Sequence, residues 1–512
     1  MSDNTSNNKR IVKNTAYLYL RMLFTAFLSL YAARLVLRNL GVEDYGIYNV
    51  VGGVVTFMDF FTATMSSATQ RFLTYNLGTG DSLKFKQTFS LLINLYIIFC
   101  AIALVILEIV GPLYISRYMV IPAERITAAQ WAFQLSLLTF LVNTILVPFK
   151  SSIVAYEKMG IYAYVSIAEA VISLVAVVAL PYISFDKLIA YGLLLCTLHI
   201  GKVLCVMMYC HYKLPDCQYV KYWDKKYIKE LVSYSGWNLF GSITGVLNLE
   251  GQAIVLNYFF GALVNAAKAI ADKVNSMVSQ LSQNFYMAVT PQIIKSYAAG
   301  NVEYMRTLVL NSSRYSFLML FVMAIPIFVT METLLGLWLG KEQVSYEMIR
   351  FCQCTIIYSL VNILEQPITM AVRATGNIKK YQIFVGSVTL SFIPLCVIIF
   401  WLGAPAYYSM LLLSLLYMLA LFVRIRIVAP IIKIVPVDYC KQVVLPLCYA
   451  IILTIISVLF LYKLRFGGTY DVLIKGATSF MIAIIVSFFV GLKHYERQLL
   501  IGYLNNKIKR TK

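Results

Sequence analysis

Histidine and acidic side chains are scarce in this sequence. It has 3 histidines, and 23 Asp and Glu residues stand against 43 Lys and Arg residues. The histidines, His199, His211 and His494, lie far apart. Cys352 and Cys354 are separated by a single residue, which is not a zinc-ligand spacing. The ten cysteines show no pairing pattern typical of a disulfide framework. We therefore expect neither a metal centre nor a disulfide-stapled fold.

Charged residues of either sign make up only 13% of the chain, whereas 60% of the residues are hydrophobic and the mean hydropathy is +0.76. Apolar runs long enough to cross a bilayer, about 20 residues, recur from Thr15 to Leu492. A soluble domain does not have this composition. The sequence therefore predicts an all-α polytopic membrane protein.

The apolar runs predict about fourteen transmembrane helices, an even number that places both ends of the chain on one side. The expected spans are 15–37, 45–72, 85–110, 128–149, 161–183, 188–210, 234–260, 264–290, 308–335, 349–372, 381–402, 407–428, 443–462 and 472–492. Lys and Arg gather in the two tails and in every second loop, and loops rich in these residues are cytoplasmic. The net charge of +20 is therefore interpreted mainly as a topology signal, with both termini cytoplasmic, and not as a nucleic-acid-binding surface.

Similar short segments recur along the chain with a constant offset, which indicates an internal repeat. The repeat pairs Gly41 with Gly261, Gly80 with Gly300, and Pro148 with Pro367. An even number of spans separates the paired features, so they predict two six-helix lobes in a parallel repeat about the membrane normal. The expected domains are an N-lobe at 1–212, a cytoplasmic linker at 213–230, a C-lobe at 231–430, and two extra helices with a basic cytoplasmic tail at 431–512.

Polar or small side chains form a stripe along the second expected span, and a matching stripe lies on the eighth. The first stripe consists of Gly52, Thr56, Asp59, Ala63, Ser66 and Gln70. The second consists of Asp272, Ser276, Ser279, Gln283, Tyr286 and Thr290. Two equivalent helices with equivalent polar faces predict two lobes that face a water-filled cleft.

Ionisable and amide side chains within the spans are the candidates for lining that cleft, because such groups usually face protein or water. The predicted substrate-binding residues are Arg21, Arg34, Gln70, Lys268, Lys273, Gln283 and Arg314, and the predicted ion-coupling residues are Asp59 and Asp272. Other interpretations stay open. Arg34 can snorkel to the interface, Lys268 and Asp272 can form a static pair within one helix, and the Ser and Thr residues can join helices.

The segment "NTAYLYLRMLFTAFLSLYAARLVLRNLGVEDYGIYNVVGGVV", followed by "SSATQRFLTYNLGTGD", resembles the N-terminal region of bacterial polysaccharide flippases of the Wzx or O-antigen transporter type. These proteins belong to the multidrug/oligosaccharidyl-lipid/polysaccharide (MOP) exporter superfamily. The detailed resemblance covers roughly the first 80 residues, and the fourteen-span, two-lobe plan, which is MATE-like, extends it over the chain. Lipid-II flippases of this superfamily carry cavity arginines in their first spans, and Arg21 and Arg34 are the matching residue types here.

The resemblance implies a transport function in the bacterial inner membrane. Such flippases move undecaprenyl-diphosphate-linked oligosaccharide to the periplasmic leaflet for O-antigen, lipopolysaccharide or capsule synthesis, by alternating access coupled to a proton or Na⁺. No cofactor is implied. The expected partners are the lipid-linked oligosaccharide and membrane lipid, with a polysaccharide polymerase left open, no nucleic acid, and a monomeric protein.

Two rival functions are open at this point. A cation-coupled drug or metabolite exporter of the MATE type has the same fold but is expected to have an apolar or acidic cavity. A membrane glycosyltransferase or polymerase requires a sizeable extramembrane loop with acidic residues. The longest expected non-cytoplasmic loop, around 336–348, carries only Glu342 and Glu347. We therefore expect no enzymatic activity.

Overall fold

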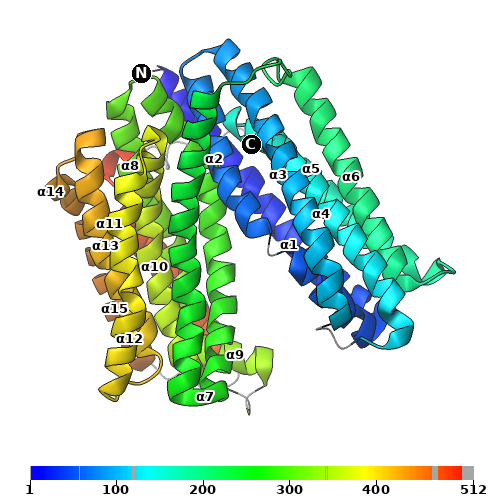
Figure 1. Ribbon diagram of the computed structural model, residues 1–512. Helices are drawn as coiled ribbons and strands as arrows, with labels where there is room; N and C mark the ends of the chain where they lie inside the picture. The colour runs from blue at the N-terminus through cyan, green and yellow to red at the C-terminus, as the bar shows by residue number, and fades with distance from the viewer. Residues whose placement is uncertain are drawn as a thin grey trace, which may run out of the picture. The chain divides into compact units, whose positions relative to one another are not determined.

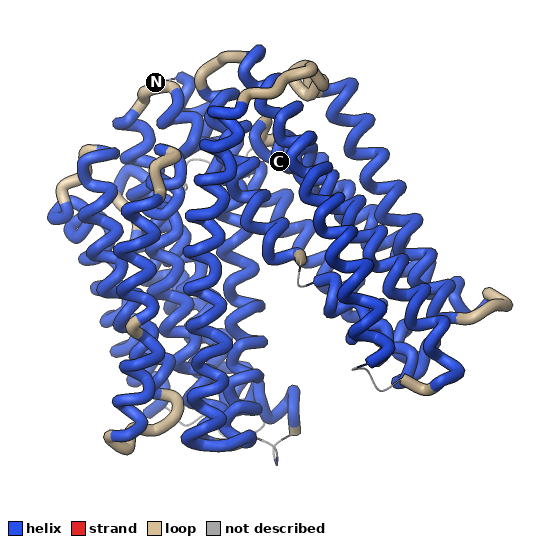
Figure 2. Tube along the Cα trace, in the orientation of Figure 1, coloured by secondary structure: helices blue, strands red, loops and turns tan. Residues whose placement is uncertain are grey.

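The structure is a computed structural model that describes residues 2–56, 58–117, 121–340, 342, 344–463 and 471–498. These residues form helices joined by short loops, with no strand among them (Figure 2). The larger helices are α1 (Ser2–Thr56), α2 (Asp59–Gly78), α3 (Ser82–Arg117), α4 (Ile126–Ala155), α5 (Met159–Ala179), α6 (Lys187–Lys213), α7 (Lys225–Ala298), α8 (Val302–Val329), α10 (Tyr346–Thr375), α11 (Lys379–Leu390), α12 (Phe392–Trp401), α13 (Tyr408–Ile432), α15 (Leu445–Lys463) and α16 (Asp471–Val486). The shorter ones are η1 (Ala123–Arg125), η2 (Leu180–Tyr182), α9 (Met331–Leu339), α14 (Pro436–Tyr439) and two π-helical turns, η4 (Cys440–Val444) and η5 (Ser487–Gly491). The predicted all-α membrane class is confirmed.

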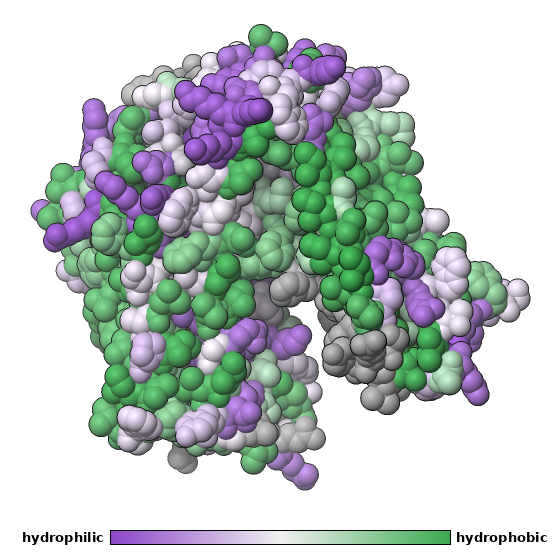
Figure 3. Space-filling view, in the orientation of Figure 1, coloured by the Kyte–Doolittle hydropathy of each residue, from purple (hydrophilic) through white to green (hydrophobic). Residues whose placement is uncertain are grey.

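Twelve helices of the described residues are long and apolar enough to cross a membrane. The expected spans 45–72 and 264–290 are not among them, although both regions are helical in the structure. These are the two segments that carry the polar stripes, so their mean hydropathy is low. The first is also interrupted, because α1 ends at Thr56 and α2 begins at Asp59. Figure 3 shows hydrophobic side chains along the helices and hydrophilic ones gathered toward their ends.

The chain divides into two compact units. Unit 1 comprises Met1–Leu239 and Ile294–Gly300, and unit 2 comprises Phe240–Ile293 and Asn301–Lys512. In unit 1, α4 packs against α1, α2, α3 and α6, while α1 also packs against α5 (Figure 1). In unit 2, α10 packs against α8 and α13, and α16 packs against α8. Two central helices, α4 and α10, therefore organise the two units.

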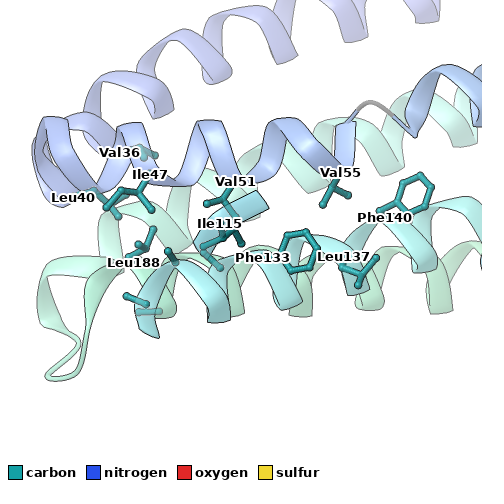
Figure 4. Packing of buried hydrophobic residues seen from close by; sticks show 14 of the residues in the cluster. Val36, Leu40, Ile47, Val51, Val55, Ile115, Phe133, Leu137, Phe140 and Leu188 are labelled. Atoms are coloured by element: carbon teal, nitrogen blue, oxygen red, sulfur yellow. The ribbon is translucent and has the colours of Figure 1, made fainter. Parts of the chain in front are cut away.

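The core of unit 1 is built from the apolar faces of α1, α3, α4, α5 and α6. Figure 4 shows Val51 and Val55 of α1, Ile115 of α3, and Phe133 of α4 within one cluster, and all four side chains are buried. Leu188, at the start of α6, is fully buried in the same cluster. Because both halves of α1 enter this core, its bend is fixed by packing on each side.

The two repeat-paired glycines inside long helices adopt the same unusual backbone conformation. Gly41 bends α1 with φ 82° and ψ 170°, and Gly261 bends α7 with φ 77° and ψ −170°. The second pair also agrees, because Gly80 has φ 73° and Gly300 has φ 72°. Such conformations are essentially restricted to glycine. Equivalent backbone bends at equivalent positions support the repeat that the sequence indicates.

Three elements of unit 1 meet at the bend of α1 through one arginine. Arg125 of η1 forms ion pairs with Asp44, three residues after the bend, and with Asp186. Asp186 also caps α6, because its carboxylate accepts hydrogen bonds from the backbone amides of Leu188 and Ile189. Partial burial raises the pKa of Asp186, but Arg125 and the two amides outweigh it, and the net pKa lies below its ordinary value. Asp44 of the "GVEDYG" segment therefore holds the bend of α1 to η1 and, through Arg125, to the start of α6.

Candidate functional site

Two positive charges of unit 1 converge on one tyrosine ring. The guanidinium carbon of Arg21, on α1, lies 4.7 Å from the centre of the Tyr162 ring, on α5. The Lys150 Nζ atom, on α4, lies 5.0 Å from the same centre. Cation–π contacts of this kind are worth about 0.5–2 kcal/mol each. We call Arg21, Lys150 and Tyr162 the cation cluster.

The local sequence brings the helices of this cluster close together. Tyr17 lies one turn before Arg21 on α1, and its ring contacts that of Tyr164 at 5.9 Å. A Cβ atom added at Gly160 would lie 3.4 Å from the Tyr17 ring, an ordinary van der Waals distance, so α1 and α5 are in contact here. Arg21 is half-buried and Lys150 is exposed. The cluster is thus partly accessible and can present two cations to a ligand.

The other predicted residues of unit 1 lie elsewhere on α1 and α2. Arg34 is exposed on α1, and its position 13 residues beyond Arg21 places the two on different faces of the helix. Asp59 is exposed in the first turn of α2, and Gln70 is half-buried on the same helix. Their roles in substrate binding and ion coupling stay predictions.

In unit 2, the predicted residues of α7 separate into a pair and two exposed side chains. The Lys268 Nζ atom lies 2.6 Å from the Asp272 Oδ2 atom, four residues further along α7. Lys268 is buried, so this pair compensates its charge within the helix. Lys273 and Gln283 are exposed on α7. The static interpretation of Lys268 and Asp272 therefore matches the observed geometry, and a function for either in transport stays a prediction.

Arg314 is enclosed in unit 2. Its side chain is 2% exposed and forms an ion pair with Glu496, which follows α16 in the chain. Its guanidinium also lies near the Asn311 side chain and over the Tyr315 ring. A buried charge needs such a counter-charge, and the pair accounts for Arg314 without any substrate. Its proposed contact with substrate stays a prediction.

Two further ionic clusters, one buried and one half-buried, join neighbouring helices, and the sequence predicts the acidic member of each but not its partner. In unit 2, Glu365 of α10 pairs with Arg424 of α13, which also donates to the Tyr381 hydroxyl at 2.9 Å. In unit 1, Glu169 of α5 meets Lys202 of α6. Each acidic residue lies in an otherwise apolar span, and that is the signal in the sequence. Their partners lie on other helices, and no pattern along the chain identifies them.

The described residues contain no group of three or more His, Cys, Asp or Glu side chains that could hold a metal ion. The described ionic groups pair with one another, as in Lys268–Asp272, Arg314–Glu496 and Glu365–Arg424. An arrangement of this type can bind an anion or respond to a charge. It offers no nucleophile–base pair among the clusters described above.

Comparison with known proteins identifies the fold as that of a known group of transporters. The MatE family model matches residues 251–398, which is less than half of the chain. No curated protein matches the sequence. An outward-facing multidrug-resistance MATE transporter of the MOP superfamily is 13% identical, with a TM-score of 0.68 over 84% of this chain and 97% of the other.

Two other solved structures give similar values. A MOP superfamily transporter from Pyrococcus furiosus is 13% identical, with a TM-score of 0.67 over 84% of this chain and 97% of its own. A mutant of the Vibrio cholerae MATE transporter VcmN is 14% identical, with a TM-score of 0.63 over 85% of this chain and 98% of its own. At these identities the similarity establishes the fold. The chain is thus a multi-pass helical membrane protein with the fold of the MATE transporters of the MOP superfamily, and its residues 251–398 match the MatE family.

Proposed function

We propose that the protein is a flippase that moves undecaprenyl-diphosphate-linked oligosaccharide from the cytoplasmic to the periplasmic leaflet of the bacterial inner membrane. The MATE-type transporter fold supports transport as the general activity. The single observation that favours an anionic cargo is the cation cluster, where Arg21 and Lys150 lie over the Tyr162 ring. The resemblance of the first 80 residues to Wzx-type flippases is consistent with this cargo.

A diphosphate head group suits the chemistry of the cation cluster. The planar guanidinium of Arg21 can donate two parallel hydrogen bonds to phosphate oxygens. The ammonium of Lys150 adds a mobile point charge, and the Tyr162 hydroxyl can donate a further hydrogen bond. The isoprenoid tail needs no polar path and can stay in the lipid. The protein therefore has to provide a polar route only for the head group and the glycan.

The proposed transport cycle is alternating access by a monomer whose two ends are cytoplasmic. A bound ion changes the conformational equilibrium only if it binds one state more tightly than the other. Asp59 and Asp272 remain the candidates for ion coupling that the sequence suggests, with a proton or Na⁺ as the ion. A polysaccharide polymerase is a candidate partner, because it would consume the flipped product.

A cation-coupled exporter of the MATE type is the second candidate function. The MatE match at residues 251–398 and the MATE structures favour it. The polarity of the binding site is the property that separates the two candidates. The Pyrococcus furiosus transporter is described as having a binding pocket of reverse polarity that suggests a different function. In this chain the cation cluster favours an anionic cargo over a cationic drug.

The decisive experiment is complementation of a bacterium that lacks its O-antigen flippase, together with binding of undecaprenyl diphosphate to the purified protein. We expect restored surface glycan and measurable binding. Arg21→Ala and Lys150→Ala should each weaken binding by roughly 10-fold, because each removes a charge-assisted hydrogen bond worth about 1.5–3 kcal/mol. Lys84→Ala, which removes an exposed lysine of α3 outside the cluster, is the matched control and should bind normally.

Each outcome of this experiment has a definite meaning. Binding that is insensitive to both cluster substitutions would exclude the cation cluster as the head-group site. Absence of both binding and complementation, combined with resistance to cationic dyes in cells that express the protein, would establish the exporter instead.

A further inference from the structure

The polar cluster around Glu169 has no part in the cation cluster, yet it lies deep in the spans of unit 1. Glu169 lies near the middle of α5, and His199 and Lys202 lie near the middle of α6. Asn143, on α4, is the fourth member. These three helices pack against one another (Figure 1). Ionisable groups at this depth are unfavourable in a bilayer and usually have a function.

The contacts define the protonation state of the histidine. The Lys202 Nζ atom donates to the Glu169 Oε1 atom at 2.8 Å and to the His199 Nδ1 atom at 2.9 Å. The Asn143 Nδ2 atom lies 3.4 Å from the same His199 nitrogen. The nearest neighbour of Nδ1 is the Lys202 ammonium, which can only donate, so Nδ1 accepts and the ring hydrogen is on Nε2. His199 is therefore neutral in this arrangement.

Protonation of His199 would force a rearrangement. A hydrogen on Nδ1 would point at the Lys202 ammonium, which is also a donor and has no lone pair to accept it. The Glu169 Oε1 atom lies 3.4 Å from Nδ1 and can accept that hydrogen instead. Lys202 and protonated His199 would then both donate to the Glu169 carboxylate, which has acceptor sites for both. The addition of one proton from water to Nδ1 would break the Lys202–His199 hydrogen bond and replace it with a His199–Glu169 hydrogen bond.

The same contacts disfavour Na⁺ at this position. A cation site would need the free carboxylate oxygens of Glu169, but the ammonium of Lys202 already lies at hydrogen-bond distance from one of them. The side chains of Glu169 and Lys202 are only 28% and 16% exposed, which leaves little room for a hydrated ion. A proton needs no such space.

A cavity beside the cluster offers a route for water. It has a volume of about 240 Å³ and lies between α1, α5 and α6, with Ser29, Tyr45, Ser173 and Tyr191 supplying hydroxyl groups to its lining. Ser173 is one turn beyond Glu169 on α5. One water occupies about 30 Å³ of liquid, and the volume and the hydroxyls suit several bound waters. The lining includes Ala170, the residue next to Glu169, so water held in the cavity would lie near the α5 side of the cluster.

The remaining charged or titratable groups on the packed helices are few in this region. Arg21 of α1 and Lys150 of α4 lie over Tyr162, which precedes Glu169 by seven residues on α5. On α6, Cys196 lies one turn before His199 and is buried. At the level of Glu169 and Ala170, α1 presents Leu28 and Ser29, which do not titrate.

We propose that Glu169, His199 and Lys202 form a proton-binding site in unit 1 and that the proton bound there is the ion coupled to transport. The second part of this proposal rests on the proposed function. The proton exchanges the Lys202–His199 hydrogen bond for a His199–Glu169 ion pair. This exchange changes the contacts between Glu169 on α5 and the two basic residues on α6, so proton binding alters the packing of these two helices. The site adds to Asp59 and Asp272 as candidates.

The test uses the fact that the chain has only three histidines. His211→Gln with His494→Gln leaves His199 as the one imidazole and leaves the cluster intact. The ¹⁵N-histidine NMR spectrum of this protein, in nanodiscs and without a histidine tag, is recorded from pH 5 to 8.5. We expect the Nε2–H tautomer at high pH and the imidazolium at low pH, with the same midpoint in Na⁺ and in choline buffers.

Two substitutions provide the matched comparison. Lys202→Met removes a cation beside His199, whereas Glu169→Gln removes an anion, so they should move the midpoint in opposite directions by about one pH unit each. A tautomer with the hydrogen on Nδ1, a midpoint that depends on Na⁺, or a midpoint unchanged by both substitutions would overturn the proposal. The titration needs no glycan, so its result does not depend on the complementation experiment. The proton site can be confirmed even if complementation fails, and it can be excluded even if complementation succeeds.

Discussion

At the scale of single residues, burial and pairing distinguish the cations of this chain more clearly than position along the sequence does. Arg314 and Arg21 both lie within apolar helices, but Arg314 is enclosed with Glu496 whereas Arg21 lies over Tyr162 with a second cation nearby. Removing one partner of a buried pair leaves an uncompensated charge, which is strongly unfavourable. Replacing both partners by apolar groups removes the desolvation penalty of each.

This contrast gives a prediction for Arg314. Arg314→Met alone should lower the stability of unit 2 by about 3–5 kcal/mol, because Glu496 is left buried and unpaired. The double variant Arg314→Met with Glu496→Leu should recover most of the loss. Thermal unfolding of the purified protein measures both effects.

Glycan export by the double variant then separates structure from substrate binding. Normal export at recovered stability would show that Arg314 acts only within unit 2. Loss of export in a stable double variant would restore Arg314 as a substrate ligand.

Pairing within one helix could be predicted from the sequence, and pairing between distant helices could not. Lys268 and Asp272 are four residues apart, so helical geometry alone suggests their contact, and the structure shows it at 2.6 Å. Arg314 and Glu496 are 182 residues apart. His199 and Lys202 are three residues apart on α6, but Glu169 joins them only because α5 and α6 pack together. Tertiary packing supplied the information that periodicity lacks.

At the scale of elements, glycine sets the bends that give α1 and α7 their course. Gly41 has φ 82°, and an added Cβ atom there would meet nothing within 4 Å. The constraint is therefore the backbone conformation and not the space around the residue. Gly46 lies five residues later on α1, is also open around an added Cβ atom, and has no positive φ. The two positions form a natural pair for comparison.

Alanine substitution should have opposite effects at the two glycines. Gly41→Ala should destabilise unit 1 by about 1–3 kcal/mol, because alanine is strained in this conformation. Gly46→Ala should be neutral or stabilising by up to about 1 kcal/mol, since alanine favours a helix interior over glycine. The repeat extends the prediction to Gly261→Ala in unit 2. Denaturation midpoints of the three variants test it, and a tolerated Gly41→Ala would show that the bend can shift to a neighbouring residue.

At the scale of the whole molecule, hydropathy predicted where most helices run but failed at the two polar ones. Regions 45–72 and 264–290 were expected as spans from their apolar runs, yet neither is among the twelve apolar spans found in the described residues. The first is divided between α1 and α2, and the second is the later part of α7. Polar side chains lower the mean hydropathy of these two regions, and mean hydropathy is the signal by which spans are recognised.

The distribution of basic residues over the whole chain predicts its orientation, which reporter fusions can test. The segment 213–230 contains five lysines, Lys213, Lys221, Lys225, Lys226 and Lys229, whereas the turn at 183–186, at the other end of α6, contains no Lys or Arg. Positive loops stay in the cytoplasm. Alkaline phosphatase fused after Ser184 should be active, and the same enzyme fused after Gln218 should be inactive. Green fluorescent protein at the C-terminus should be fluorescent. The reverse pattern would place the cation cluster near the periplasmic surface, where a flippase releases its cargo, and the head-group role of Arg21 and Lys150 would then have to be abandoned.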